Sequence, residues 1–407
     1  MAVAPGAGPS LRGSEFGPYK IVRRLGVGGM AETFEAVRTG DEGFSQRVCL
    51  KLALPFLRED EAFVKLFQRE ARLAAKLRHS NIVGILDYGS VEGTPYMALE
   101  LVDGVDLLAV IETKKKLRFE HVTLLAIELA KGLSHAHDPP LSAGLDDSST
   151  GLQGIVHRDI SPSNVMLSQQ GEILLTDFGV AKAMSGASRH QSAVKGKIPY
   201  MSPEQLRNEP VDGRSDLFSL GIVLYEALCG SRPFDGGNDP ATILRILKGD
   251  HAPLWQLARE APREFCDVVD GLLAPDRNNR PTTASELISQ LDAFAPSPRA
   301  QQELGSLVGE LRRDSIARQD ALDSQAPTAH QADAGVQSGV MPSRVQVDAE
   351  TSAADALIPT DPSLGAGELD EGEERPEGVH VNVSAILAVA IVAAMLVGIF
   401  LFAARLV

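Results

Sequence analysis

The chain has 407 residues, an apolar share of 44% and a formal net charge of −15. It is long enough for two or three domains and apolar enough to bury a core, and its acidic balance gives no reason to expect nucleic-acid binding, which normally shows a basic patch. Its three cysteines are far apart and lack metal-ligand spacing, so we expect small buried hydrophobes in a reducing compartment.

Residues 19–294 alternate apolar and polar positions densely and predict one folded domain after a flexible N-terminus, residues 1–18. Its first part favours strands and one amphipathic helix, and its later part favours helices. A small strand-rich lobe followed by a larger helical lobe is an α+β plan, with a ligand cleft expected between the lobes. In chain order, the expected elements are strands at 19–26, 32–39 and 44–54 and helices at 60–79, 120–137, 215–230 and 264–274.

The composition changes after this domain. Residues 295–382 are rich in Pro, Ala, Gln, Ser and acidic residues, which predicts a disordered linker because too little apolar surface is available to offset the entropy of ordering. Within it we expect a short helix at 300–323, which could pack back on the domain or contact a partner. Its apolar residues recur at helical spacing: Leu304, Leu307, Val308 and Leu311.

Residues 383–404 read VSAILAVAIVAAMLVGIFLFAA, without a charge. At about 1.5 Å per residue a helix of this length reaches roughly 33 Å, enough to cross a bilayer core. We therefore expect a single-pass anchor in the cell membrane, rather than a buried core helix, with the folded domain in the cytoplasm. A stripe of small residues in it could pair two anchors into a homodimer: Ala390, Ala394 and Gly398.

A glycine cluster, LGVGGMAETFEAV, lies between the first two expected strands. It contains Gly26, Gly28 and Gly29, with Ala31 where a third spaced glycine would fall. Glycines let a backbone approach a phosphate closely and present its N–H groups. By itself the cluster is equally typical of a hairpin, and it is no dinucleotide fingerprint because a strand follows it.

Four further residues have the chemistry of phosphoryl transfer. Lys51, on the third expected strand, could hold phosphates if Glu70 of the next helix paired with it. In HRDISPSN, Asp159 could accept the proton of an attacking hydroxyl, and the carbonyl of Asn164 suits a hard Mg²⁺ ion. Asp177, in LLTDFG, could bridge a second metal position to the phosphates.

The order of glycine loop, strand lysine, helix glutamate, HRDxxxxN, DFG, SPE and the aspartate of RSDLFSLG resembles the eukaryotic-like (Hanks-type) protein kinases, particularly membrane-anchored bacterial serine/threonine kinases. The resemblance covers about residues 19–294. It implies the two-lobed protein kinase fold, ATP and Mg²⁺ as cofactors, and protein substrates phosphorylated on Ser or Thr.

The resemblance also implies roles for individual residues. Asp159 would be the catalytic base, Asn164 and Asp177 would bind the metal, and Leu99 would be the gatekeeper beside adenine. Glu204 and Arg280 would form a structural ion pair in the helical lobe. The residues implied around the nucleotide are Leu25, Gly26, Gly28, Gly29, Ala31, Thr33, Lys51, Glu70, Glu100, Val102 and Asp106.

One departure from the family pattern affects the chemistry. Ser161 stands where these kinases have a lysine that neutralises the transferring phosphate, and Lys197 stands where they have a threonine. Because the two positions face each other across the cleft, we expect an exchange of roles. Lys197 would supply the ammonium and Ser161 the hydroxyl, which places both with Asp159 among the catalytic residues.

The predicted function is therefore an active protein kinase in membrane-tethered signalling. The alternative is a catalytically weak pseudokinase that acts as a membrane-anchored nucleotide-binding scaffold. A small-molecule phosphotransferase would share the base and metal residues, but the long segment from DFG to SPE favours a peptide platform. That segment also contains three serines, Ser185, Ser188 and Ser192, and we expect autophosphorylation at Ser188 or Ser192.

Overall fold

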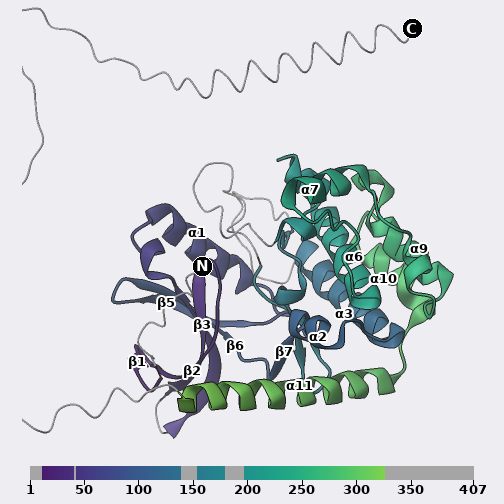
Figure 1. Ribbon diagram of the computed structural model, residues 1–407. Coiled ribbons are helices and arrows are strands. Elements are labelled where there is room, and N and C mark those ends of the chain that lie inside the picture. Colours follow the sequence, from purple (N-terminus) through teal and green to yellow (C-terminus); the bar gives the residue numbers. More distant parts are fainter. Residues whose placement is uncertain (1–11, 41–42, 139–153, 179–196, 326–407) are drawn as a thin grey trace, which may run out of the picture. The chain divides into compact units, whose positions relative to one another are not determined.

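The computed structural model describes residues 12–40, 43–138, 154–178 and 197–325, which form a β-sheet lobe followed by a helical lobe (Figure 1). The two lobes expected from the sequence are therefore present. No helix among these residues is long and apolar enough to cross a bilayer. The expected anchor at 383–404 and the three candidate serines between DFG and SPE lie outside the described residues.

The first lobe is an antiparallel sheet of six strands in the order β1-β2-β3-β4-β6-β5. Alternate side chains are buried along much of β4, as expected for a strand with one covered face, whereas β6 is buried at six consecutive positions. Phe34, Val48 and Leu50 are at most 3% exposed. The strand bounds are β1 Glu15–Phe16, β2 Tyr19–Val27, β3 Ala31–Thr39, β4 Ser45–Ala53, β5 Ile85–Val91 and β6 Thr94–Glu100.

Helix α1, Glu61–Ala74, covers this sheet by packing on β5 and β6. It begins where the Asp60 carboxylate accepts hydrogen bonds from the first free backbone N–H groups of the helix, a standard N-cap. It ends five residues before the expected limit at 79. Its inner face carries Phe67, Ala71 and one carboxylate, Glu70.

The helical lobe begins at a small sheet, β7-β8-β9, that follows the connection between the lobes. Helix α6 is its centre, because almost every side chain from Ser215 to Leu228 is buried. The bounds are β7 Gly104–Asp106, β8 Val165–Ser168, β9 Ile173–Leu175, α2 Leu107–Lys114, α3 Phe119–His137, α5 Pro203–Leu206, α6 Gly213–Cys229, α7 Asp239–Lys248, α8 Leu254–Leu257, α9 Arg263–Leu272 and α10 Ala284–Leu291.

A last helix, α11, extends over Pro298–Gln325, the segment in which the sequence places a short helix inside a disordered linker. Leu304 and Val308 are fully buried in the core of the helical lobe, and Leu307 and Leu311 pack against it. The helix lies along α3, β7 and β8 (Figure 1). The folded part of the chain therefore continues about thirty residues past the expected boundary at 294, because this apolar stripe has a core to join.

Candidate active site

The strand lysine meets a different partner from the expected one. Lys51 Nζ donates to Asp177 Oδ1 at 2.8 Å, and no ion pair between described residues joins Lys51 to Glu70. Burial would lower the pKa of Lys51, but the charges of Asp177 and Glu70 outweigh burial and raise it. Burial likewise opposes ionisation of Asp177, yet Lys51 lowers the pKa of that carboxyl. Both groups are therefore charged at neutral pH.

Glu70 is consequently a buried carboxyl that forms no salt bridge with any described residue. It is 8% exposed, and burial raises its pKa from 4.5 to about 7, against the opposing influence of Lys51. Near neutral pH this side chain is partly protonated. Deprotonation or a small movement of α1 would favour the pairing with Lys51 that the sequence predicts.

Glu70→Gln should therefore stabilise the fold at pH 8 but not at pH 5. Because the folded pKa is raised, the contribution of Glu70 is fully present below about pH 4.5 and is lost as pH rises through 7. The expected difference is on the order of 3 kcal/mol at pH 8, read from urea unfolding at both pH values. Glu61→Gln, at the exposed start of the same helix, is the control. An equal change in unfolding free energy at both pH values for Glu70→Gln would contradict the conclusion that Glu70 is buried and partly protonated near neutral pH.

The catalytic loop is held by a buried aspartate of α6. Asp216 Oδ2 accepts from the backbone N–H of His157 at 2.7 Å, and Oδ1 accepts from that of Arg158 at 2.8 Å. Arg158 has a φ of 64°, a left-handed conformation that costs energy for a residue with a side chain. Two charge-assisted hydrogen bonds to consecutive N–H groups fix this turn, and the next residue is Asp159.

Asn164 lies beside the expected base. Its amide nitrogen donates to the Asp159 backbone oxygen at 2.7 Å and to Asp159 Oδ2 at 3.0 Å. The amide nitrogen is therefore turned toward Asp159, which leaves the carbonyl oxygen as the atom suited to a cation. Thr176, directly before Asp177, donates its backbone N–H to the Asn164 backbone oxygen at 3.0 Å and so joins the two expected metal ligands.

The structure brings Lys197 into contact with Asp159. The Lys197 ammonium donates to Asp159 Oδ2 and forms an ion pair with it; the Asp159 side chain is 12% exposed and that of Lys197 is 32% exposed. Ser161, 2% exposed, is on the same loop, but its hydroxyl shares a hydrogen bond of 3.1 Å with the Ser163 hydroxyl. The ammonium of the expected exchange therefore lies at the base, whereas the hydroxyl has a neighbouring serine as its partner.

The glycine loop joins β2 to β3, and β3 pairs with β4, the strand that carries Lys51. In the β3–β4 register Thr33 faces Lys51, and the Thr33 hydroxyl donates to the Gly26 backbone oxygen at 3.2 Å. The Gly28 N–H donates to the Ala31 backbone oxygen at 2.8 Å, which closes the loop as a hairpin. Ala31 is buried, so its extra Cβ is accommodated.

The residues expected at adenine and ribose lie at the connection between the lobes. Leu99 is buried and faces Cys49 in the β4–β6 register, and the Glu100 N–H donates to the Gly84 backbone oxygen at 2.9 Å. Val102 follows directly. Asp106, expected at the ribose, caps helix α2 by accepting from the Ala109 N–H at 2.7 Å, and burial raises its pKa.

A cavity of about 460 Å³ adjoins the catalytic loop and contains residues that the sequence analysis did not single out. Ser161 and Lys197 line it, as do Tyr200 and Glu226, whose side chains are joined by a hydrogen bond of 2.6 Å that Tyr200 donates. The sequence contains one signal that could have indicated this cavity: Glu226 places a carboxylate within the largely apolar helix expected at 215–230. The other lining residues are Leu108, Ile111, Glu112, Pro162, Ser163, Gly230, Ser231, Arg232 and Asp235.

The arrangement fits a metal that the nucleotide helps to hold. The described residues contain no group of three or more His, Cys, Asp and Glu side chains suited to a metal ion. One amide oxygen from Asn164 and one carboxylate from Asp177 suit Mg²⁺, which usually takes one or two protein oxygens and completes its shell with phosphate and water. These two residues would hold it.

Comparison with known proteins gives the same architecture. The protein kinase domain model matches residues 19–291. The tyrosine-protein kinase MasK of Myxococcus xanthus is 40% identical over 69% of this chain and 43% of its own length. The probable serine/threonine-protein kinase PknB of Lactococcus lactis is 32% identical over 70% of this chain and 43% of its own. The chain thus spans less than half the length of these two curated relatives.

Among solved structures, the kinase domain of PknI from Mycobacterium tuberculosis superposes with a TM-score of 0.51 at 26% sequence identity. The match covers 72% of this chain and 99% of that one.

Proposed function

Because this chain belongs to the protein kinase domain family, we propose that it transfers the γ-phosphoryl group of ATP to Ser or Thr hydroxyls of protein substrates. The observation that carries the proposal is the meeting of Lys197 with Asp159 beside the Lys51–Asp177 pair. One base, two ammonium groups and two metal-binding oxygens from distant parts of the chain converge there, as phosphoryl transfer requires.

The residues divide the reaction between them. An acceptor hydroxyl enters from the cavity beside Ser161, and its oxygen attacks the γ-phosphorus while its proton passes to an Asp159 carboxylate oxygen. The bond from phosphorus to the bridging oxygen breaks, and ADP leaves with the electron pair. Lys197 offsets the negative charge at the transferring group. A bound Mg²⁺ would neutralise the phosphate oxygens, held by Asn164 and Asp177.

The Lys51–Asp177 pair marks a resting arrangement. Asp177 must face the metal during transfer, so binding of metal and nucleotide would compete with Lys51 for that carboxylate. Glu70 then offers Lys51 a replacement partner, since its charge already acts on Lys51. Lys51 would hold the α- and β-phosphates in the resulting state.

The experiment is incubation of the full chain with radiolabelled ATP, Mg²⁺ and a general protein acceptor. Label should enter acid-stable phosphoserine and phosphothreonine. Removal of Mg²⁺ by EDTA should abolish it, because no divalent cation would then offset the charge of the phosphates beside the Asp177 carboxylate. Calcium added at the same concentration is the control for ionic strength. Nucleotide binding without any transfer would contradict the proposal and favour the pseudokinase scaffold.

A second candidate acceptor is tyrosine, because a relative at 40% identity is named a tyrosine-protein kinase. Phosphoamino-acid analysis of the same labelled acceptor separates the two. Label confined to phosphotyrosine would replace the Ser/Thr assignment.

The cellular setting is also a proposal. The uncharged run at 383–404 supports a single-pass anchor in the cell membrane, with the kinase domain on the cytoplasmic side, where ATP is available. Its small-residue stripe supports pairing of two anchors. Membrane fractionation of the full chain against a chain truncated after residue 382 tests the anchor directly.

A further inference from the structure

Helix α11 is built into the helical lobe through its backbone as well as its side chains. A Cβ added at Gly305 would lie 2.5 Å from the backbone oxygen of Gln169, in the turn between β8 and β9. One added at Gly171, in the same turn, would lie 2.1 Å from the backbone oxygen of Gln301. Real Cβ atoms do not approach this closely, so helix and turn are packed backbone to backbone. With the buried Leu304 and Val308, this contact fixes α11 along the lobe.

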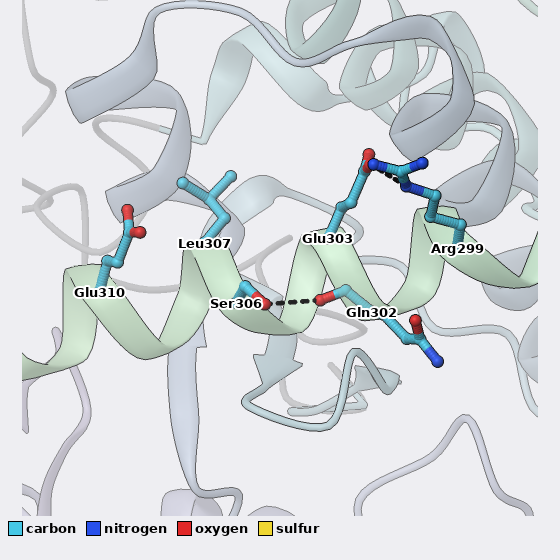
Figure 2. Close-up of a pocket in the computed structure, with 6 residues that line it drawn as sticks. All are labelled: Arg299, Gln302, Glu303, Ser306, Leu307 and Glu310. Atoms are coloured by element: carbon cyan, nitrogen blue, oxygen red, sulfur yellow. Dashed lines mark hydrogen bonds and ion pairs between the residues drawn. The ribbon is translucent and has the colours of Figure 1, made fainter.

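Polar contacts fix the first half of the helix as well. Glu303 accepts from Arg299 of its own helix at 2.9 Å, and from Arg118, which precedes α3, at 2.7 Å. Figure 2 shows the Arg299–Glu303 pair on α11, with Leu307 extending from the next turn. The helix therefore has a defined position when it reaches the connection between the lobes.

At that connection α11 contacts the carboxylate of Asp103, which lies in the segment expected to bind adenine and ribose. Asp103 directly follows Val102, and its Oδ2 accepts from the Gln169 side chain at 2.9 Å. Arg312 of α11 forms an ion pair with Asp103 Oδ1. The two atoms, Arg312 Nη1 and Asp103 Oδ1, are shielded from solvent and have no hydrogen-bond partner among the described residues, so this ion pair is the contact that meets their charges. The Arg312 side chain is 12% exposed and that of Asp103 is 45% exposed.

Charged residues of the β-sheet lobe also act on Arg312. Burial lowers its pKa, as do Arg23 and Arg47, whereas Glu35 acts in the opposite direction. These three residues belong to β2, β4 and β3, where the buried Glu35 accepts from Arg23 at 2.8 Å and from Arg47 at 2.6 Å. Charges of the β-sheet lobe therefore act on a guanidinium that is carried by a helix of the other lobe.

We propose that Arg312 is a positioning residue for nucleotide binding. By holding the Asp103 carboxylate against α11, it sets the backbone at Val102 and the short strand β7 that ends at Asp106. This inference rests on the proposed function, because it assigns those residues to adenine and ribose. Loss of the contact should weaken nucleotide binding and leave the phosphoryl-transfer residues in place.

The test compares Arg312→Gln with Arg313→Gln, the exposed neighbour on the same helix. Calorimetric titration with Mg·ADP and steady-state kinetics with Mg·ATP should both be run. For Arg312→Gln we expect a Kd for ADP and a KM for ATP about fivefold higher, with kcat at saturating ATP unchanged within about twofold. Arg313→Gln should match the wild type. Arg312→Lys should recover part of the affinity, since it keeps the charge but not the planar fork.

Two further variants separate positioning from stability. Asp103→Asn should raise the Kd by a similar factor. Combining it with Arg312→Gln should raise the Kd little further, because both substitutions remove the same contact. Gly305→Ala should weaken ADP binding because its Cβ forces α11 off the β8–β9 turn. Gly309→Ala, whose Cβ would find its nearest neighbour at 3.5 Å, should not.

Wild-type affinity in Arg312→Gln, or effects of Arg312→Gln and Asp103→Asn that simply multiply, would overturn the inference. A loss of affinity that appears only near the melting temperature would do the same. A chain that binds ADP but transfers no phosphate would contradict the proposed function alone, because the binding comparison does not depend on transfer.

Discussion

Lys197→Met should lower kcat by about 10²–10³-fold while leaving the affinity for ATP close to that of the wild type. The ammonium contacts Asp159, where the negative charge of the transferring phosphate would develop. Methionine keeps much of the length of the side chain and removes the charge. Steady-state kinetics at saturating Mg·ATP, with Asp159→Asn as the reference for full loss, measures the effect.

Three controls sharpen this prediction. Lys116→Met removes an exposed lysine that pairs with Glu260 far along the chain, and it should leave kcat unchanged. Lys197→Arg should retain part of the activity, because the charge remains near the base. Adding Ser161→Lys to Lys197→Met should restore some turnover by returning a cation to the position usual in the family. Full turnover in Lys197→Met would refute the exchange of roles between positions 161 and 197.

Arg280→Met should destabilise the domain by about 3–5 kcal/mol. Arg280 forms a bidentate pair with Glu204, at 2.8 and 3.0 Å, and neither side chain is more than 2% exposed. Methionine fills much of the same volume, so the loss comes from an uncompensated buried carboxylate and from three backbone oxygens that lose their donor, those of Arg214, Ala274 and Pro275. Urea unfolding should show this loss, with a melting temperature lower by roughly 10 °C.

The pH dependence gives this prediction a second reading. Burial opposes ionisation of Glu204, but its hydrogen bonds to Arg280 and Ser215 lower the pKa below the usual value. The stability from this group is therefore present above pH 4.5 and is lost as pH falls through the lower folded pKa. In Arg280→Met the sign should reverse, with stability rising as pH falls. The double variant with Glu204→Met should recover only the part of the loss that comes from the unpaired carboxylate, because both charges are then gone while the backbone oxygens served by Arg280 still lack their donor.

Much of the site follows from residue types and spacing. A strand lysine, an acid and an amide five residues apart, and a carboxylate after a short strand are local patterns, and the sequence predicts each on its own. The exchange at Ser161 and Lys197 also predicts that an ammonium lies near the base, because a charge lost at one position must be supplied from another. Lys197 lies against Asp159 in the structure.

The partners within the site could not be predicted in this way. The charges of two carboxylates, Glu70 and Asp177, act on Lys51. The sequence favoured Glu70 as its ion-pair partner, whereas the structure pairs it with Asp177. Neither is a near neighbour of Lys51 in the sequence, so the choice depends on how α1 packs on the sheet. The Ser161 hydroxyl is similar, since only the turn of its loop decides that Ser163 is its partner.

The sequence by itself determined the order of the motifs, the α+β plan and the apolar stripe of α11, because these depend on neighbours a few residues apart. Only the tertiary structure decided where α11 packs and which charge Arg312 meets. Asp103 and Arg312 are more than two hundred residues apart in the sequence. Their contact depends on the close packing of the α11 backbone on the β8–β9 turn at Gly305 and Gly171. Local periodicity carries no information about such a distance, which is set by the packing of the whole domain.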